Sequence, residues 1–252
     1  MITIMEEKKV AKVRIMNPEE VSKDCLKRIG WMASVSTNFD KEEHYERVAK
    51  KCIEDGHKVP TYGFLFLLEI SEISRVNSHE LVRHEQGFYK VQRSQRYVKE
   101  DGFGYTVPDS IKGKEFAVKM TDSDELLMTF DEMIALTQRF YNAMLDFGIK
   151  AEDARYVLTN ATHTKLHVAV NFEALRRFGN MRLCTLAQPE MRELAWEIKK
   201  AITEINPYFG DKIVSTCEEL GYCVDSRCCG YAEPKKRIEE LVEKGRMYEQ
   251  LI

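Results

Sequence analysis

The sequence lacks any long hydrophobic run, and this absence argues against a membrane-spanning helix. The longest apolar stretch runs from Phe64 to Leu68 and is followed directly by Glu69, whereas a membrane span needs about 20 apolar residues. A secretory signal is not expected either, because residues 1–13 are charged and contain no apolar core. Positive charge is not in surplus: 38 Lys and Arg face 41 Asp and Glu, which gives a net charge of −3. This balance argues against bulk binding of nucleic acid.

No segment is rich in glycine, serine or proline, and we find no repeat, so nothing in the composition indicates a linker. A chain of 252 residues can bury a sizeable core without disulfides or metals. We expect one domain over residues 1–252, with a cysteine-containing C-terminal extension from about residue 207. Seven cysteines are an odd number, which without an export signal favours free thiols in a reducing, cytoplasmic compartment.

Hydrophobic periodicity predicts an α+β fold with more helix than sheet. The first helix is expected to begin at an Asn17 cap with Pro18 in its first turn, and the second to end before Gly56. Strands are predicted at residues 10–16, 61–71 and 162–170, and helices at residues 17–31, 41–54, 72–82, 122–147, 171–181, 189–205 and 234–251.

The densest polar cluster runs from Arg83 to Tyr97 and contains three Arg, one His, one Lys and two Tyr. Arginine presents a planar fork of donors that suits phosphate and carboxylate groups. In a chain of negative net charge, this local positive charge indicates an anionic ligand. The alternative interpretation, a solvated charged loop after a helix, stays open. Further along, Arg155 and Arg182 flank a predicted strand and helix, where they either converge on one site or form surface salt bridges.

The two clusters together resemble the flavin-dependent thymidylate synthases. That family's signature reads R-H-R, then seven residues, then S-x-R, and here Arg83-His84 is followed by Ser94 and Arg96. Three further positions, Arg155, then Asn171 sixteen residues later and Arg182 eleven residues after that, keep the order and spacing of the family's C-terminal half. A segment at residues 56–60 is similar to the family's G-H-x-[ST]-P motif. The resemblance covers residues 10–205.

The resemblance implies helices packed on an antiparallel-rich sheet and a homotetramer with active sites between subunits. It also implies transfer of a one-carbon unit from methylenetetrahydrofolate to C5 of dUMP, with FAD that is reduced by NADPH. Arg182 would be catalytic, because it matches the arginine that favours ionisation at N3 of the uracil. By the same resemblance dUMP would be bound by Arg83, Ser94, Gln95, Arg96, Arg155 and Arg182, and FAD would lie along Arg83, His84, Gln92 and Asn171.

The sequence departs from the family pattern mainly on the flavin side. The third signature residue is Glu85 instead of Arg, Glu173 replaces another Arg, and Val59 stands where a hydroxyl side chain is usual. Two changes from Arg to Glu would reverse the local charge beside a pyrophosphate, although Lys90, Arg93, Arg176 or Arg177 could supply cations from new positions. The alternative is therefore a diverged paralog that binds a pyrimidine nucleotide with altered C5 chemistry, such as hydroxymethylation, or without flavin chemistry.

Two other groups contain metal-ligating residue types, and neither predicts a metal site. Four cysteines, at positions 217, 223, 228 and 229, match no standard metal motif and are interpreted as free or loosely paired thiols. Two histidines, His163 and His167, lie about 13 Å apart if they sit on a strand, too far to share an ion. Single-strand nucleic-acid binding through the basic and aromatic residues 89–97 is a third function class, which the acidic balance disfavours.

Overall fold

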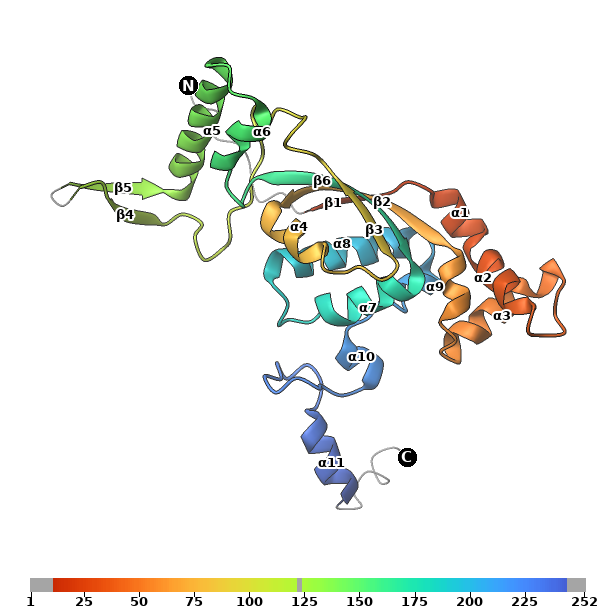
Figure 1. Ribbon diagram of the computed structural model, residues 1–252. Coiled ribbons are helices and arrows are strands. Elements are labelled where there is room, and N and C mark those ends of the chain that lie inside the picture. The colour runs from red at the N-terminus through yellow and green to blue at the C-terminus, as the bar shows by residue number, and fades with distance from the viewer. Residues whose placement is uncertain (1–10, 122–123, 244–252) are drawn as a thin grey trace. The chain divides into compact units, whose positions relative to one another are not determined.

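The computed structural model describes residues 11–121 and 124–243. It confirms the α+β class, with a four-stranded sheet in the order β1-β2-β6-β3 and a separate two-stranded sheet, β4-β5 (Figure 1). The strands are β1 (Lys12–Ile15), β2 (Leu65–Ser74), β3 (Phe88–Gln92), β4 (Glu115–Lys119), β5 (Glu125–Thr129) and β6 (His163–Asn171).

Hydrogen bonds at the strand ends show that neighbours in the larger sheet run antiparallel. The amide of Met16, just after β1, donates to the carbonyl of Leu67 near the start of β2. The amide of Arg93, just after β3, donates to the carbonyl of Lys165 near the start of β6. In the smaller sheet β4 and β5 pair antiparallel, with Glu115 opposite Thr129. The expectation of an antiparallel-rich sheet is confirmed.

The described residues form two compact units. Unit 1 comprises residues 11–12, 69–83, 90–121 and 124–167, and unit 2 comprises residues 13–68, 84–89 and 168–243. In unit 1, the β4-β5 hairpin leads directly into α5 (Figure 1). The helices of unit 1 are α4 (Arg75–Leu81), α5 (Phe130–Asp146), α6 (Ala151–Ala154) and the 3-10 helix η2 (Arg155–Val157).

Unit 2 contains the N-terminal and C-terminal helices and an aromatic core. The rings of Phe66 and Phe209 lie 5.6 Å apart, and those of Phe172 and Phe209 lie 4.7 Å apart. All three side chains are buried, and edge-on aromatic pairs of this kind add to the area term of burial. The helices are α1 (Pro18–Lys23), α2 (Cys25–Ser34), α3 (Glu42–Glu54), η1 (Val59–Gly63), α7 (Phe172–Arg182), α8 (Pro189–Ile205), α9 (Pro207–Gly210), α10 (Thr216–Leu220) and α11 (Lys235–Glu243).

Several predicted elements are confirmed, among them the helix at residues 41–54 and the strand at residues 162–170. The helix predicted at residues 189–205 has the observed bounds of α8. Gly56 follows α3 with a φ of 77°, a left-handed conformation that glycine adopts without strain. The predicted final helix extends to residue 251, but only its part up to residue 243 lies within the described residues.

The helix predicted over residues 17–31 is wrong as a single element, because it breaks at Asp24 into α1 and α2. Aspartate competes for backbone hydrogen bonds and is a weak helix former. The Asn17 side chain makes no cap bond. Its carboxamide instead donates to the carbonyl of Leu65 and accepts from the amide of Leu67, both at 3.0 Å. Asn17 therefore connects the end of β1 to the start of β2.

Four strand assignments also differ from the prediction, and one of them, β4, lies in a segment for which no strand is predicted. Residues 125–129 form β5 rather than the start of a long helix, because cross-strand pairing with β4 overrides their helix propensity. The capping box of Thr129 and Glu132 then starts α5. Strand β2 continues to Ser74, so α4 starts later than expected. The cluster at residues 83–97 contains β3, a strand at the edge of the sheet, rather than only a loop.

Within the described ranges, no helix is long and apolar enough to cross a membrane.

Candidate active site

Two of the arginines predicted to bind the nucleotide come together in unit 1, although they are far apart in sequence. The Arg96 guanidinium forms an ion pair with the Glu152 carboxylate, with Nη2 and Oε2 3.2 Å apart. The Nε of Arg155 donates to the backbone carbonyl of Glu152 at 3.0 Å. Glu152 lies in α6 and Arg155 opens η2, so one short turn positions both guanidinium groups. Glu152 was not predicted as a site residue.

The other residues predicted on this side surround β3 and α4. Gln92 ends β3, and its side chain donates to the hydroxyls of Ser78 at 2.9 Å and Thr164 at 3.2 Å. The Ser94 hydroxyl accepts from the amide of Arg96 at 3.2 Å, which fixes the turn after β3. Gln95 is buried and Arg83 is exposed just beyond α4. Gln92 is therefore tied into unit 1, and its predicted role at the flavin stays a prediction.

In unit 2, the predicted catalytic residue Arg182 contacts the predicted flavin residue His84. The Nε of Arg182 donates to Nε2 of His84 at 3.1 Å, which assigns the ring proton to Nδ1 when His84 is neutral. The His84 ring packs edge-on against Phe178, with ring centroids 5.0 Å apart. Phe178 and Arg182 both lie on α7. Helix α7 thus positions the His84 ring through Phe178, and the His84 ring in turn orients the guanidinium of Arg182.

Asn171 caps the first turn of α7. Its side-chain oxygen accepts from the amide of Ala174 at 2.8 Å, and its own amide donates to the carbonyl of Gly87 at 3.0 Å. A Cβ atom at Gly87 would lie 2.2 Å from the Asn171 side chain, so only glycine permits this close approach. Arg177 joins the same region, since it donates to both the side chain and the carbonyl of Gln86 at 2.8 Å. Residues 84–87 are therefore held against α7.

The two acidic departures from the family pattern have different surroundings. Glu173 is buried, but its carboxylate pairs with Lys58 at 3.1 Å and with Arg176 at 3.5 Å. Arg176 also pairs with Glu219 of α10. Glu85, by contrast, is exposed. The buried acid is thus neutralised inside unit 2, and it adds no uncompensated negative charge to the flavin side.

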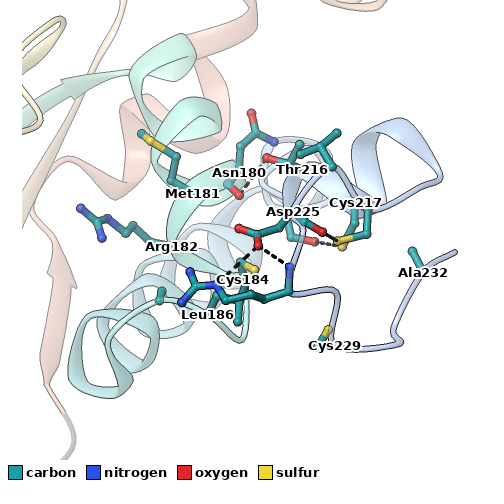
Figure 2. Close-up of a pocket in the computed structure, with 15 residues that line it drawn as sticks. Asn180, Met181, Arg182, Cys184, Leu186, Thr216, Cys217, Asp225, Cys229 and Ala232 are labelled. Atoms are coloured by element: carbon teal, nitrogen blue, oxygen red, sulfur yellow. Dashed lines mark hydrogen bonds and ion pairs between the residues drawn. The ribbon is translucent and has the colours of Figure 1, made fainter. Parts of the chain in front are cut away.

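A cavity of about 290 Å³ opens beside the end of α7 in unit 2 (Figure 2). Its walls come from α7, the segment after it, α10 and the loop that follows α10. Hydrogen bonding from the Thr185 side chain lowers the pKa of Cys229 in this wall. The described residues contain no group of three or more His, Cys, Asp or Glu side chains placed to hold a metal ion. Lining residues include Asn180, Arg182, Cys184, Cys217, Cys223, Asp225 and Cys229.

Comparison with known proteins assigns the chain to a family. The family described as "Thymidylate synthase complementing protein" (Thy1) matches residues 7–208. A flavin-dependent thymidylate synthase of Pyrococcus furiosus is 31% identical over 219 residues, which cover 80% of this chain and 86% of the relative. One from Geobacter sulfurreducens is 35% identical over 195 residues, which cover 75% and 78% of the two chains. The chain therefore belongs to the flavin-dependent thymidylate synthase family.

The predicted enzyme class, a flavin-dependent methyltransferase of the thymidylate synthase type, is confirmed by this membership. A solved structure supports the fold. The UMP/dUMP methylase PolB from Streptomyces cacaoi, bound with 5-Br dUMP, superposes with a TM-score of 0.62 at 19% identity and covers 84% of this chain and 100% of its own. The family match ends at residue 208, close to the start of the predicted C-terminal extension. The extent of the domain itself stays a prediction.

Proposed function

We propose that this protein transfers a one-carbon unit from methylenetetrahydrofolate to C5 of dUMP, with FAD as the flavin and NADPH as its reductant. Family membership supports the reaction type. The observation that carries the substrate assignment is the meeting of Arg96 and Arg155 at Glu152. Two guanidinium groups at one turn suit a phosphate dianion, which binds them with charge-assisted hydrogen bonds.

In this proposal Arg96 exchanges its ion pair with Glu152 for a contact with the nucleotide phosphate. The Arg96 side chain is 52% exposed and that of Glu152 is 36% exposed. Pairs with this exposure contribute only about 0–1 kcal/mol. A nucleotide phosphate therefore competes with Glu152 at little cost in stability. Ser94, Gln95 and Arg83 complete the proposed nucleotide-binding set around the same turn and the end of α4.

The charges of the residues in unit 2 fit a flavin. Arg177 and Arg182 keep cations on α7, and the acid that replaces a family arginine, Glu173, is neutralised by Lys58. His84 and Asn171 would lie along the FAD, with Arg83 and Gln92 as further contacts. When bound, the flavin supplies the hydride and assists the one-carbon transfer.

Arg182 supplies electrostatic stabilisation in the proposed reaction. As C5 of the uracil becomes nucleophilic, negative charge develops at the ring, and a fixed cation beside N3 stabilises it. The hydrogen bond to His84 holds the Arg182 side chain in one orientation before the substrate arrives. Preorganisation of this kind avoids the cost of reorienting the cation during the reaction.

The assembly and the cellular compartment are part of the proposal. We expect a homotetramer with active sites shared between subunits, because the resemblance of the motifs to the family implies that assembly. All seven cysteines are free in the structure, which suits a reducing, cytoplasmic compartment.

The test combines spectroscopy with product analysis. Purified protein should show a flavin spectrum, and with dUMP, methylenetetrahydrofolate and NADPH it should form dTMP, detected by mass spectrometry. A colourless protein that binds dUMP would instead support the paralog without flavin chemistry. A hydroxymethylated nucleotide would support altered C5 chemistry. A protein that neither binds dUMP nor modifies it would contradict the proposal.

A further inference from the structure

Arg75, which the sequence motifs do not include, opens α4 beside the segment that carries Arg155. The amide of Arg75 donates to the carbonyl of Thr162 at 3.0 Å, and the amide of Val76 donates to the carbonyl of Asn160 at 3.1 Å. These bonds join the start of α4 to the turn at residues 159–162. Arg155 opens η2 just before that turn, and the amide of Leu158 donates back to its carbonyl. All of these residues belong to unit 1.

Arg75 lies close enough to Arg155 for the two positive charges to disfavour each other. Arg75 is half-buried, and its guanidinium forms no hydrogen bond or ion pair with any residue in the described part of the chain. Burial lowers the pKa of Arg75, and the nearby charge of Arg155 lowers it further, while Glu100 acts in the opposite direction. Glu100 is itself buried and pairs with Arg93 at 3.1 Å. The Glu100 carboxylate is thus shared between its ion pair with Arg93 and its electrostatic effect on Arg75.

Unpaired polar groups occur on the same two segments. Asn77, two residues after Arg75 on α4, is fully buried, and neither atom of its carboxamide has a partner within the described ranges. The hydroxyls of Thr159 and Thr162 are likewise buried there without a partner. Buried polar groups are nearly always hydrogen-bonded, so each exception needs an explanation. A bound anion together with its hydration would supply acceptors and donors at this place.

We propose that Arg75 acts with Arg155 as a phosphate-binding pair for the nucleotide substrate. This inference rests on the proposed function for the identity of the ligand. A like-charged pair in a half-buried position is unfavourable by itself, because each guanidinium disfavours the other. A phosphate dianion reverses the balance, since each arginine donates a fork of hydrogen bonds to its oxygens. The excess positive charge is then a feature of the binding site, retained at some cost to stability.

The test compares wild type, Arg75→Gln and a control, Arg139→Gln, by calorimetric titration with dUMP. Arg139 is an exposed residue of α5 whose Nε donates to the carbonyl of Ala135 in the same helix. We expect Arg75→Gln to bind dUMP roughly 10- to 100-fold more weakly, the size of a lost charge-assisted contact. The control should match wild type. Arg75→Lys should recover part of the loss, because the charge remains without the fork.

Two further readouts separate phosphate binding from a structural role. Binding of deoxyuridine, which lacks the phosphate, should change less than about twofold in Arg75→Gln, as measured by ligand-observed NMR. The melting temperature of the ligand-free variant should stay the same or rise, because an unfavourable pair has been removed. An equal loss for dUMP and deoxyuridine together with a lower melting temperature would make Arg75 a structural residue and overturn the inference.

Failure of the inference is distinguishable from failure of the proposed function. If wild type and Arg75→Gln bind dUMP equally, Arg75 is excluded and the proposed function stands. If wild type binds inorganic phosphate but not dUMP, and Arg75→Gln loses the phosphate, the arginine pair is supported and the proposed substrate fails. If wild type binds neither dUMP nor phosphate, both are overturned.

Discussion

At the residue scale, the contact between Arg182 and His84 gives the proposed reaction its most specific element. Their hydrogen bond joins side chains 98 positions apart, and Phe178 fixes the plane of the ring. Arg182 is therefore oriented by its own subunit before any ligand binds. Loss of the Arg182 side chain is therefore expected to affect turnover more than the affinity for the substrate.

Arg182→Ala should keep the fold and much of the affinity for dUMP while losing most of the turnover. An interaction made mainly in the transition state lowers kcat more than it weakens substrate binding. Removing one preorganised donor typically costs about 100- to 1000-fold in rate. Single-turnover assays at saturating dUMP, run beside a thermal melt, measure both quantities. Arg47→Ala, an exposed change on α3, is the control. Unchanged turnover per folded molecule would leave Arg182 with a structural role only.

The cysteines should differ strongly in reactivity, because only the thiolate is nucleophilic. A hydrogen bond from Thr185 lowers the pKa of the exposed Cys229, whereas burial raises the pKa of Cys25 well above its usual range. Iodoacetamide at neutral pH should label Cys229 first and leave Cys25 unlabelled in the folded protein. Peptide mapping by mass spectrometry after short exposures gives the order. Early labelling of Cys25 would show that its environment opens in solution.

At the element scale, α7 carries much of what the sequence could not show. The motif comparison identifies Glu173 as a replacement for arginine, but the compensating Lys58 lies 115 positions earlier, just before η1. The charge reversal is thus matched by a partner that no local pattern connects to it. This ion pair, in which only the Glu173 side chain is buried, ties α7 to the segment at residues 56–60.

Restoring the family residue by Glu173→Arg should therefore destabilise the protein instead of improving it. The new cation would lie in the buried position of Glu173 beside Lys58 and Arg176, and an uncompensated buried charge typically costs several kcal/mol, up to about 3–5 kcal/mol. The double variant Glu173→Arg with Lys58→Glu should regain part of this loss. Urea denaturation measures the free energy of unfolding, with the exposed Glu204→Arg on α8 as control. Equal stability of wild type and Glu173→Arg would show that the pair contributes nothing.

Prediction from sequence succeeded where periodicity was strong and failed where pairing between distant segments decides the structure. Helix α8 has a clear apolar stripe and begins at a proline, so both ends could be predicted. Strand β5 could not, because Leu and Met favour helix locally and only the pairing with β4 makes them a strand. A missed local signal was the Thr129 and Glu132 capping box. It marks the start of α5 inside the predicted long helix.

For the candidate site as well, prediction succeeded on local motifs and failed on contacts between distant segments. Motif spacing identified Arg96, Arg155 and Arg182, which are residues of a known family pattern. It did not identify Glu152, which holds the first two together. Nor did it identify Arg75, whose significance comes from burial and from the charge beside it. Contacts across 50 residues or more follow from the fold and have no short signature in the sequence.

At the scale of the whole molecule, the exposed apolar side chains of unit 1 support an oligomer. Large apolar patches on a monomer commonly mark interaction surfaces. These side chains lie on the β4-β5 hairpin and on α5 and the residue that follows it. The exposed residues are Phe116, Leu126, Leu127, Leu136, Phe140 and Phe147.

For the proposed homotetramer, light scattering at micromolar concentration should give about four times the 29.4 kDa of one chain. Leu127→Lys, which places a charge on the exposed hairpin, should shift the population towards smaller species if this face lies in the interface. Glu204→Arg, outside that face, should leave the mass unchanged. A wild type that remains monomeric would contradict the shared-site proposal.

The aromatic core of unit 2 also sets an order of events during synthesis. Phe66 and Phe172 reach full packing only with Phe209, which belongs to α9 and lies just beyond the end of the family match at residue 208. Domains generally fold as units while the ribosome adds residues. The core of unit 2 therefore cannot close until the ribosome has released α9. Until then the nascent chain exposes Phe66 and Phe172, which is the interval when a chaperone would be most useful.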